Sequence, residues 1–112
     1  MDIKKYKNKM QYPEVLRRPH LNHTHSSEKV IQYAEDLKKY EDSLPKYQEE
    51  KQKYRVEENR LYDLFKQDAF EELAIEKHPK KDILWSIAWE RGHDGGLQNV
   101  WAEVQELSEL LT

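Results

Sequence analysis

Three histidines lie within six residues near the N-terminus, at positions 20, 23 and 25. Imidazole nitrogens ligate zinc, copper and nickel, so this spacing could bind a divalent transition metal. The chain has no cysteine, however, and no carboxylate lies among the three histidines. Because the surrounding segment has the composition of a flexible arm, we predict a polar loop rather than a preformed metal site for His20, His23 and His25.

Glu90 and His93 form a Glu-x-x-His pair. Residues three apart share a face of a helix, and carboxylate-bridged di-iron bundles use this pair. Such bundles need two copies and further glutamates, whereas this chain has one copy, so a homodimer would have to supply the second. A metal-dependent helical-bundle enzyme is therefore the third of three functional hypotheses, and we expect His93 to make a structural hydrogen bond instead.

All three glycines of the chain fall within five residues. Glycine allows a positive φ or a close approach of another backbone, so Gly92, Gly95 and Gly96 are predicted to form a structural junction between helices. If the helix continued, Gly92 and Gly96 would share a face and let a second helix come close. The segment lacks the GxxxxGK[ST] pattern of a phosphate-binding loop.

Aromatic and basic side chains supply the candidates for partner recognition, because Trp and Tyr dominate binding hot spots and Lys and Arg contact phosphates. Of the tryptophans, Trp85, Trp89 and Trp101 are expected mainly in the core. We find no Ser/His/Asp or Cys/His arrangement, so we predict no catalytic site and no cofactor. The candidate partner-binding residues are Tyr33, Tyr40, Tyr47, Tyr54, Trp89, His93, Lys4, Lys5, Arg17 and Arg18.

The composition of the 112 residues bounds the class of protein. A net charge of −3 is too small to indicate a partner, and the absence of cysteine excludes a disulfide scaffold and a Cys-based zinc site. No apolar run approaches the roughly 18 residues of a membrane span. The N-terminus has no apolar signal-peptide core, so we expect a cytoplasmic protein without a membrane segment.

The elements that must position these residues fall into three parts. Residues 1–26 carry a net charge of +4 and contain Pro13 and Pro19, which favour extended geometry. We predict an extended basic arm over 1–26 and a single helical domain over 27–112. Within that domain, residues 27–78 form a long helix or a kinked pair, and residues 79–112 form a C-terminal helical segment.

Residues 27–78 begin with Ser26 or Ser27 as a helix cap. Apolar residues then recur with a heptad spacing, which winds helices around one another. We call these positions the tyrosine seam: Val30, Tyr33, Leu37, Tyr40, Leu44, Tyr47, Tyr54, Leu61 and Phe65. Tyrosine hydroxyls favour water or a polar partner, so the seam is either partly exposed or completed by another helix.

Pro45 interrupts this helix, since proline lacks an amide hydrogen and clashes with the preceding turn. The seam stays in phase across it, which favours a kink or tight junction with retained direction over a hairpin. Pro79 is expected to end the helix near Lys77, and Asp82 to cap or charge the start of the next one.

The last segment contains the most apolar stretch. One face is predicted to carry Ile83, Leu84, Ile87 and Ala88, and a later stripe runs from Leu97 to Leu111. The sequence therefore predicts an all-α fold: a long, charged, coiled-coil-like helix packed antiparallel against C-terminal helices. We expect the seam of residues 47–65 to meet the stripe of residues 97–111, and the leftover Tyr and Leu positions to support a homodimer.

The segment from residue 79 onward resembles small accessory proteins of tailed bacteriophages and prophages. The resemblance rests on an AWE-x-GH-x-x-G pattern followed by valine and a paired-leucine end, carried here by Ala88, Trp89, Glu90, Gly92, His93, Gly96 and Val100. It implies a non-enzymatic accessory protein in the bacterial cytoplasm that binds and inhibits a host protein, for example a restriction or CRISPR defence component. The alternative is a nucleic-acid-associated protein that uses the basic arm, although the net charge of −7 on the remaining chain opposes it.

Overall fold

The computed structural model describes residues 1–21 and 26–111. The described residues contain helices and no strand, so the predicted all-α class is confirmed. The helical elements, in chain order, are the 3-10 helix η1 (Ile3–Tyr6), α1 (Ser27–Glu72), α2 (Lys81–Gly92), the 3-10 helix η2 (His93–Gly95), α3 (Leu97–Ser108) and the 3-10 helix η3 (Glu109–Leu111).

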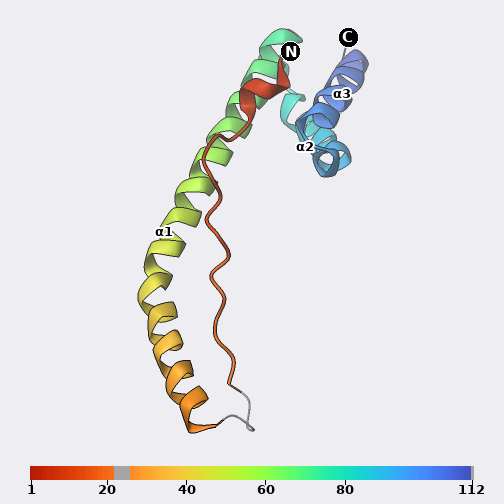
Figure 1. The fold of residues 1–112 in the computed structure, drawn as a ribbon. Coiled ribbons are helices and arrows are strands. Elements are labelled where there is room, and N and C mark those ends of the chain that lie inside the picture. The colour runs from red at the N-terminus through yellow and green to blue at the C-terminus, as the bar shows by residue number, and fades with distance from the viewer. Residues whose placement is uncertain (22–25, 112) are drawn as a thin grey trace. The chain divides into compact units, whose positions relative to one another are not determined.

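The chain divides into two compact units, and α1 takes part in both (Figure 1). We call Lys9–Glu57 the middle unit, and Met1–Asn8 together with Glu58–Thr112 the terminal unit. This division differs from the predicted boundary after residue 26. It differs at two places. The sequence placed η1 in an extended arm, but η1 belongs to the terminal unit, and α1 as far as Glu57 belongs to the middle unit.

In the middle unit, α1 starts at Ser27 and runs through Pro45 without a break. The carbonyl of Ser26 accepts the first helical hydrogen bond, from the Val30 amide at 3.0 Å, so the predicted start is confirmed. The retained direction at Pro45 is confirmed as well. Glycine is absent from the whole of α1, and spaced charges such as Glu49 and Lys53, which pair at 3.2 Å, support the helix.

The tyrosine seam of the middle unit meets an extended segment of the same chain. Residues 9–21 have no helix or strand and run along α1 in Figure 1. The ring of Tyr12 packs edge-on against Tyr54, with centroids 5.0 Å apart. Pro13, Leu16 and Pro19 are half-buried and recur every three residues, the repeat of a polyproline II helix. Of the two alternatives for the seam, partial exposure or completion by another helix, neither describes the part that this extended segment covers.

In the terminal unit, the end of α1 packs antiparallel against α2, as predicted. Tyr62, early in this stretch, contacts Trp89 late in α2, and Phe70 near the end of α1 contacts Trp85. Helix α3 then runs antiparallel to α2. Gly92 at the end of α2 lies against Val100 near the start of α3, and Leu84 near the start of α2 lines a groove with Leu107 near the end of α3. Arg91 pairs with Glu103 across the two helices at 3.8 Å.

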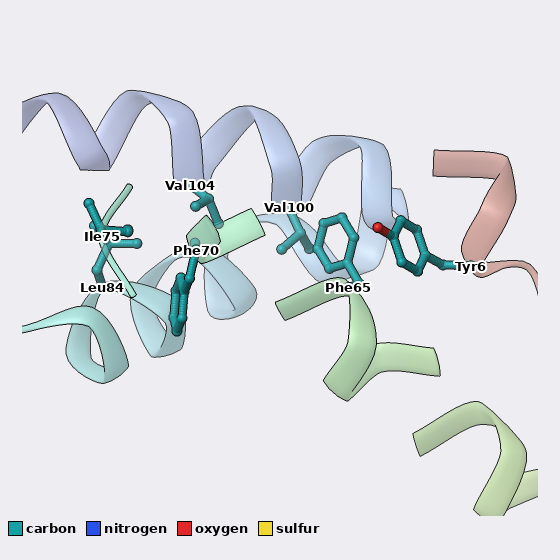
Figure 2. Close-up of a cluster of buried hydrophobic side chains, with 8 residues drawn as sticks. Tyr6, Phe65, Phe70, Ile75, Leu84, Val100 and Val104 are labelled. Carbon is teal, nitrogen blue, oxygen red and sulfur yellow. The ribbon is translucent and has the colours of Figure 1, made fainter. Parts of the chain in front are cut away.

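The core of the terminal unit lies where η1, α1, α2 and α3 meet. Phe65 lies beside Tyr6 on one side and Val100 on the other (Figure 2). Of the predicted seam, Phe65 therefore meets the stripe of α3, whereas Tyr47 and Tyr54 belong to the middle unit. The other buried members of this core are Phe70, Ile75, Leu84, Ala88 and Val104.

Helix α1 ends at Glu72, before the predicted end near Lys77. The amide of Ile75 donates to the Phe70 carbonyl at 2.9 Å, and that of Ala74 donates to Glu71 at 3.1 Å. This pattern is a Schellman motif, with Ala74 in the left-handed position at φ 56°. Pro79 therefore lies in the connection beyond the helix and does not terminate it.

We expect Ala74→Gly to stabilise the terminal unit by about 1 kcal/mol. Left-handed backbone strains a residue that has a Cβ atom, and glycine relieves that strain. Urea unfolding followed by tryptophan fluorescence measures the change. The control is Lys77→Gly in the same connection, where φ is not positive and no gain is expected. A stabilisation of equal size in both variants would contradict the assignment.

The hydroxyl of Tyr6 anchors η1 to α1. It donates a hydrogen bond of 2.6 Å to Oδ2 of Asp68, which also pairs with Lys5 at 3.7 Å. Ile3 and Tyr6 lie on one face of the 3-10 helix, and Tyr6 is only 4% exposed. Burial and then the bond to Asp68 raise the pKa of the Tyr6 phenol above its ordinary value of 10.0.

We expect Tyr6→Phe to lower the free energy of unfolding by about 2 kcal/mol near neutral pH, the cost of losing a hydrogen bond to a charged group. Because the folded-state pKa of the phenol is raised, this contribution is complete below about pH 10 and is lost as the pH rises through the folded-state pKa. The stability gap between the wild type and Tyr6→Phe should therefore shrink above pH 10. Urea titrations of both proteins at pH 8 and at pH 11 measure the gap, and an unchanged gap would disprove the argument.

Candidate functional site

An open hollow of about 350 Å³ lies in the terminal unit between the end of α1 and α2. Each helix contributes residues at positions i, i+1 and i+4, and the two sets line one hollow. We call this the aromatic hollow; its lining residues are Tyr62, Asp63, Lys66, Trp85, Ser86 and Trp89.

Three aromatic rings define the hollow. The centroids of Tyr62 and Trp89 are 5.2 Å apart with the rings inclined at 65°, and those of Trp85 and Trp89 are 5.9 Å apart at 32°. All three side chains are half-buried. The hydroxyl of Tyr62 donates to Oε1 of Glu58 at 3.2 Å, which fixes the Tyr62 ring along α1.

His93 extends this row of rings. Its imidazole stacks on Trp89 with an interplanar angle of 9° and a centroid distance of 5.7 Å. Nδ1 donates to the carbonyl of Trp89 at 2.7 Å, because a carbonyl oxygen can only accept. The predicted structural hydrogen bond of His93 is thereby present. Nε2 lies 3.1 Å from Oδ1 of Asp94.

Lys66 is a charged residue of the lining, and it pairs with a carboxylate next to the hollow. Nζ of Lys66 pairs with Oδ1 of Asp82 at 3.4 Å and lies 6.0 Å from the Trp85 ring centroid. Asp82 occupies the first turn of α2, where its charge favours the helix start as predicted, but no side chain caps this helix. Ser86 donates its hydroxyl to the Asp82 carbonyl at 3.0 Å and so stays within its own helix.

The glycine junction lies next to this site and behaves as predicted. Gly96 has φ +87° and ψ 176°, a region essentially restricted to glycine. Gly92 is buried, and a Cβ placed on it would lie 2.7 Å from the Val100 amide nitrogen. The junction thus turns the chain at Gly96 and lets α3 approach α2 at Gly92.

The predicted partner-binding residues are not gathered in one unit. Trp89 and His93 lie in the aromatic hollow and its extension, whereas Tyr33, Tyr40, Tyr47 and Tyr54 are half-buried in the middle unit. Lys4 and Lys5 belong to the terminal unit, and Arg17 and Arg18 are exposed in the middle unit. The basic residues proposed for nucleic acid are therefore divided between the units.

Sequence reasoning missed Tyr62, Asp63 and Lys66 as site residues. A signal existed, because Tyr62 follows Leu61 directly and so lies off the heptad seam. Such an aromatic residue faces a different surface from the seam. It could therefore be expected to contact other aromatic residues, such as the i, i+4 pair of Trp85 and Trp89.

The predicted apolar face of α2 needs a correction. Leu84 and Ala88 are buried, but Ile83 is 64% and Ile87 37% exposed, because positions 83 and 87 lie about 100° away around the helix. They line an apolar groove with Leu107, Leu110 and Leu111. Homodimerisation stays a prediction, and light scattering after size-exclusion chromatography tests it.

The described residues contain neither a metal-binding cluster nor a membrane-spanning helix. Among residues 1–21 and 26–111, no group of three or more His, Asp or Glu side chains is arranged to hold a metal ion. His23 and His25 lie outside the described residues, so their predicted loop is not observed. Within the part of the chain that the structure describes, no helix combines the length and apolar character needed to cross a bilayer.

Comparisons with known proteins bear on the family alone. No curated protein and no solved structure matches the sequence. A family model matches residues 2–112, nearly the whole chain, so both units and the aromatic hollow fall within the match. The chain belongs to the family of unknown function DUF8546.

Proposed function

We propose that this chain is a non-enzymatic accessory protein that binds a partner protein through the aromatic hollow. The observation that carries the proposal is the incomplete burial of Tyr62, Trp85 and Trp89 around an open hollow. Tyr and Trp dominate the binding energy of protein interfaces when a partner desolvates them. The fold leaves these rings available for such a contact.

The openness of the hollow favours a protein segment over a small molecule. Sites for small ligands enclose most of the ligand surface. Here two helices form an open depression, which suits a side chain presented by another protein. The resemblance to phage accessory proteins adds the proposal that this partner is a bacterial host protein, which binding would inhibit.

Photocrosslinking from inside the hollow tests this function. Ser86 lines the hollow and is exposed, so a benzoylphenylalanine at position 86 would contact a bound partner. The matched control carries the same residue at the exposed Gln105 of α3, outside the hollow. In bacterial cells we expect a discrete crosslinked protein from position 86 and none from position 105. Equal labelling at both positions, or no product at position 86, would contradict the proposal.

A further inference from the structure

The aromatic hollow carries one unmatched negative charge. Lys66 is the cation of the lining, and its charge is matched by Asp82 at 3.4 Å. Asp63 is exposed, and within the part of the chain that the structure describes it takes part in neither an ion pair nor a hydrogen bond. A ligand with a positive charge would therefore neutralise the charge of Asp63 in the hollow.

The rings beside Asp63 favour the same class of ligand. Aromatic faces attract a cation within about 6 Å of the ring centroid, and indole does so best. Aromatic rings in and next to the hollow already contact one cation, because Nζ of Lys66 lies 5.8 Å from the centroid of Phe70 and 6.0 Å from that of Trp85. The rings of Tyr62 and Trp89 line the same hollow.

We propose that the hollow binds the guanidinium side chain of an arginine on the partner protein, with Asp63 as its counter-ion and Tyr62 and Trp89 as its aromatic walls. Arginine fits better than lysine because its planar guanidinium stacks on rings, is more weakly hydrated, and matches a carboxylate with two parallel hydrogen bonds. This inference rests on the proposed function and names the chemistry of its partner.

The first experiment uses N-acetyl-arginine amide as the probe on the full chain, with indole N–H signals in ¹⁵N-labelled protein as the readout. Trp85 and Trp89 line the hollow, whereas Trp101 lies on α3 outside it and serves as an internal reference. We expect saturable shifts of the first two signals only. N-acetyl-citrulline amide, the neutral isostere, should bind at least about fivefold more weakly, the loss expected for a cation–π contact.

Two conservative variants then test the counter-ion. Asp63→Asn should weaken binding of the arginine probe about fivefold and leave that of the citrulline probe unchanged. Glu106→Gln on α3, also exposed, removes a carboxylate outside the hollow and should change neither. Equal affinity for the two probes, an unchanged affinity in Asp63→Asn, shifts of Trp101 as large as those of Trp89, or no shift at all would each overturn the inference.

The two proposals can fail separately. A crosslink from position 86 that persists in Asp63→Asn, combined with no binding of the arginine probe, would disprove the arginine site and leave the proposed function standing. Specific binding of the probe without any crosslink from position 86 would instead disprove the protein partner. An Asp63→Asn variant that loses both the probe and the crosslink supports the two together.

Discussion

Replacing Phe65 with alanine is expected to lower the free energy of unfolding of the terminal unit by about 3–5 kcal/mol, the usual cost of truncating a fully buried phenylalanine. Phe65 is 0% exposed. Its ring packs edge-on against Tyr6 with centroids 5.2 Å apart and tilts against Trp85 at 5.6 Å. Alanine would remove the contacts of α1 with both η1 and α2. It would leave a cavity between these three elements that they cannot fill by small shifts.

Tryptophan fluorescence isolates this effect, because all three tryptophans belong to the terminal unit. Urea titration of the wild type and Phe65→Ala gives the difference in unfolding free energy. Val56→Ala is the matched control, since Val56 lies on α1 in the middle unit and is 58% exposed, and it should change stability by less than about 0.5 kcal/mol. A loss below 1 kcal/mol in Phe65→Ala would show that its ring is not central to the core.

The parts of the fold that follow from local sequence were predicted correctly. The helix start after Ser26 lies where a serine cap was predicted, and the continuity through Pro45 follows from the phase of the seam. The junction at Gly92 and Gly96 follows from the grouping of all three glycines of the chain within residues 92–96. Each of these features depends on residues within a few positions of one another, and sequence spacing reports such features directly.

The features that the sequence did not predict depend on distant contacts or on strained backbone. Tyr6 was hidden in a lysine-rich segment, and it is buried through its contact with Phe65 and its hydrogen bond to Asp68, which is 62 residues away. The end of α1 depends on Ala74 at a positive φ, where glycine would have been the usual signal. The spacing of Pro13, Leu16 and Pro19 did not by itself predict that this segment packs on the tyrosine seam, because that contact is also distant in sequence.

The candidate site shows the same division. Trp89 and His93 were selected from their type and spacing, and both lie in or next to the aromatic hollow. Tyr62, Asp63 and Lys66 become site residues only because α1 and α2 pair antiparallel with one register. Residue types indicate which side chains could recognise a partner, whereas the register of helix pairing decides which of them act together.

Replacing Gly92 with alanine is expected to destabilise the terminal unit by about 3 kcal/mol, the upper end of the usual cost of overpacking a core. The new Cβ atom would lie 2.7 Å from the Val100 amide nitrogen and 2.9 Å from the Asn99 carbonyl carbon. Both are backbone atoms, so relief requires α3 to move away from α2. The better helix propensity of alanine offsets only about 1 kcal/mol of that cost.

The neighbouring glycines separate this steric effect from a conformational one. At Gly96 no atom lies within 4 Å of an added Cβ, so Gly96→Ala should cost only the strain of its positive φ, about 1–3 kcal/mol. At Gly95 the added Cβ meets only the flexible side chain of Asn99, which can rotate away, and the effect should be small. Trp89 lies on α2 one turn before Gly92, and His93, which stacks on it, follows Gly92 directly. Gly92→Ala should therefore also alter the indole N–H signal of Trp89, and Gly95→Ala should not. Urea titrations and the indole spectra of the three variants test this order, and a Gly92→Ala protein as stable as Gly95→Ala would show that α3 does not need its close approach to α2.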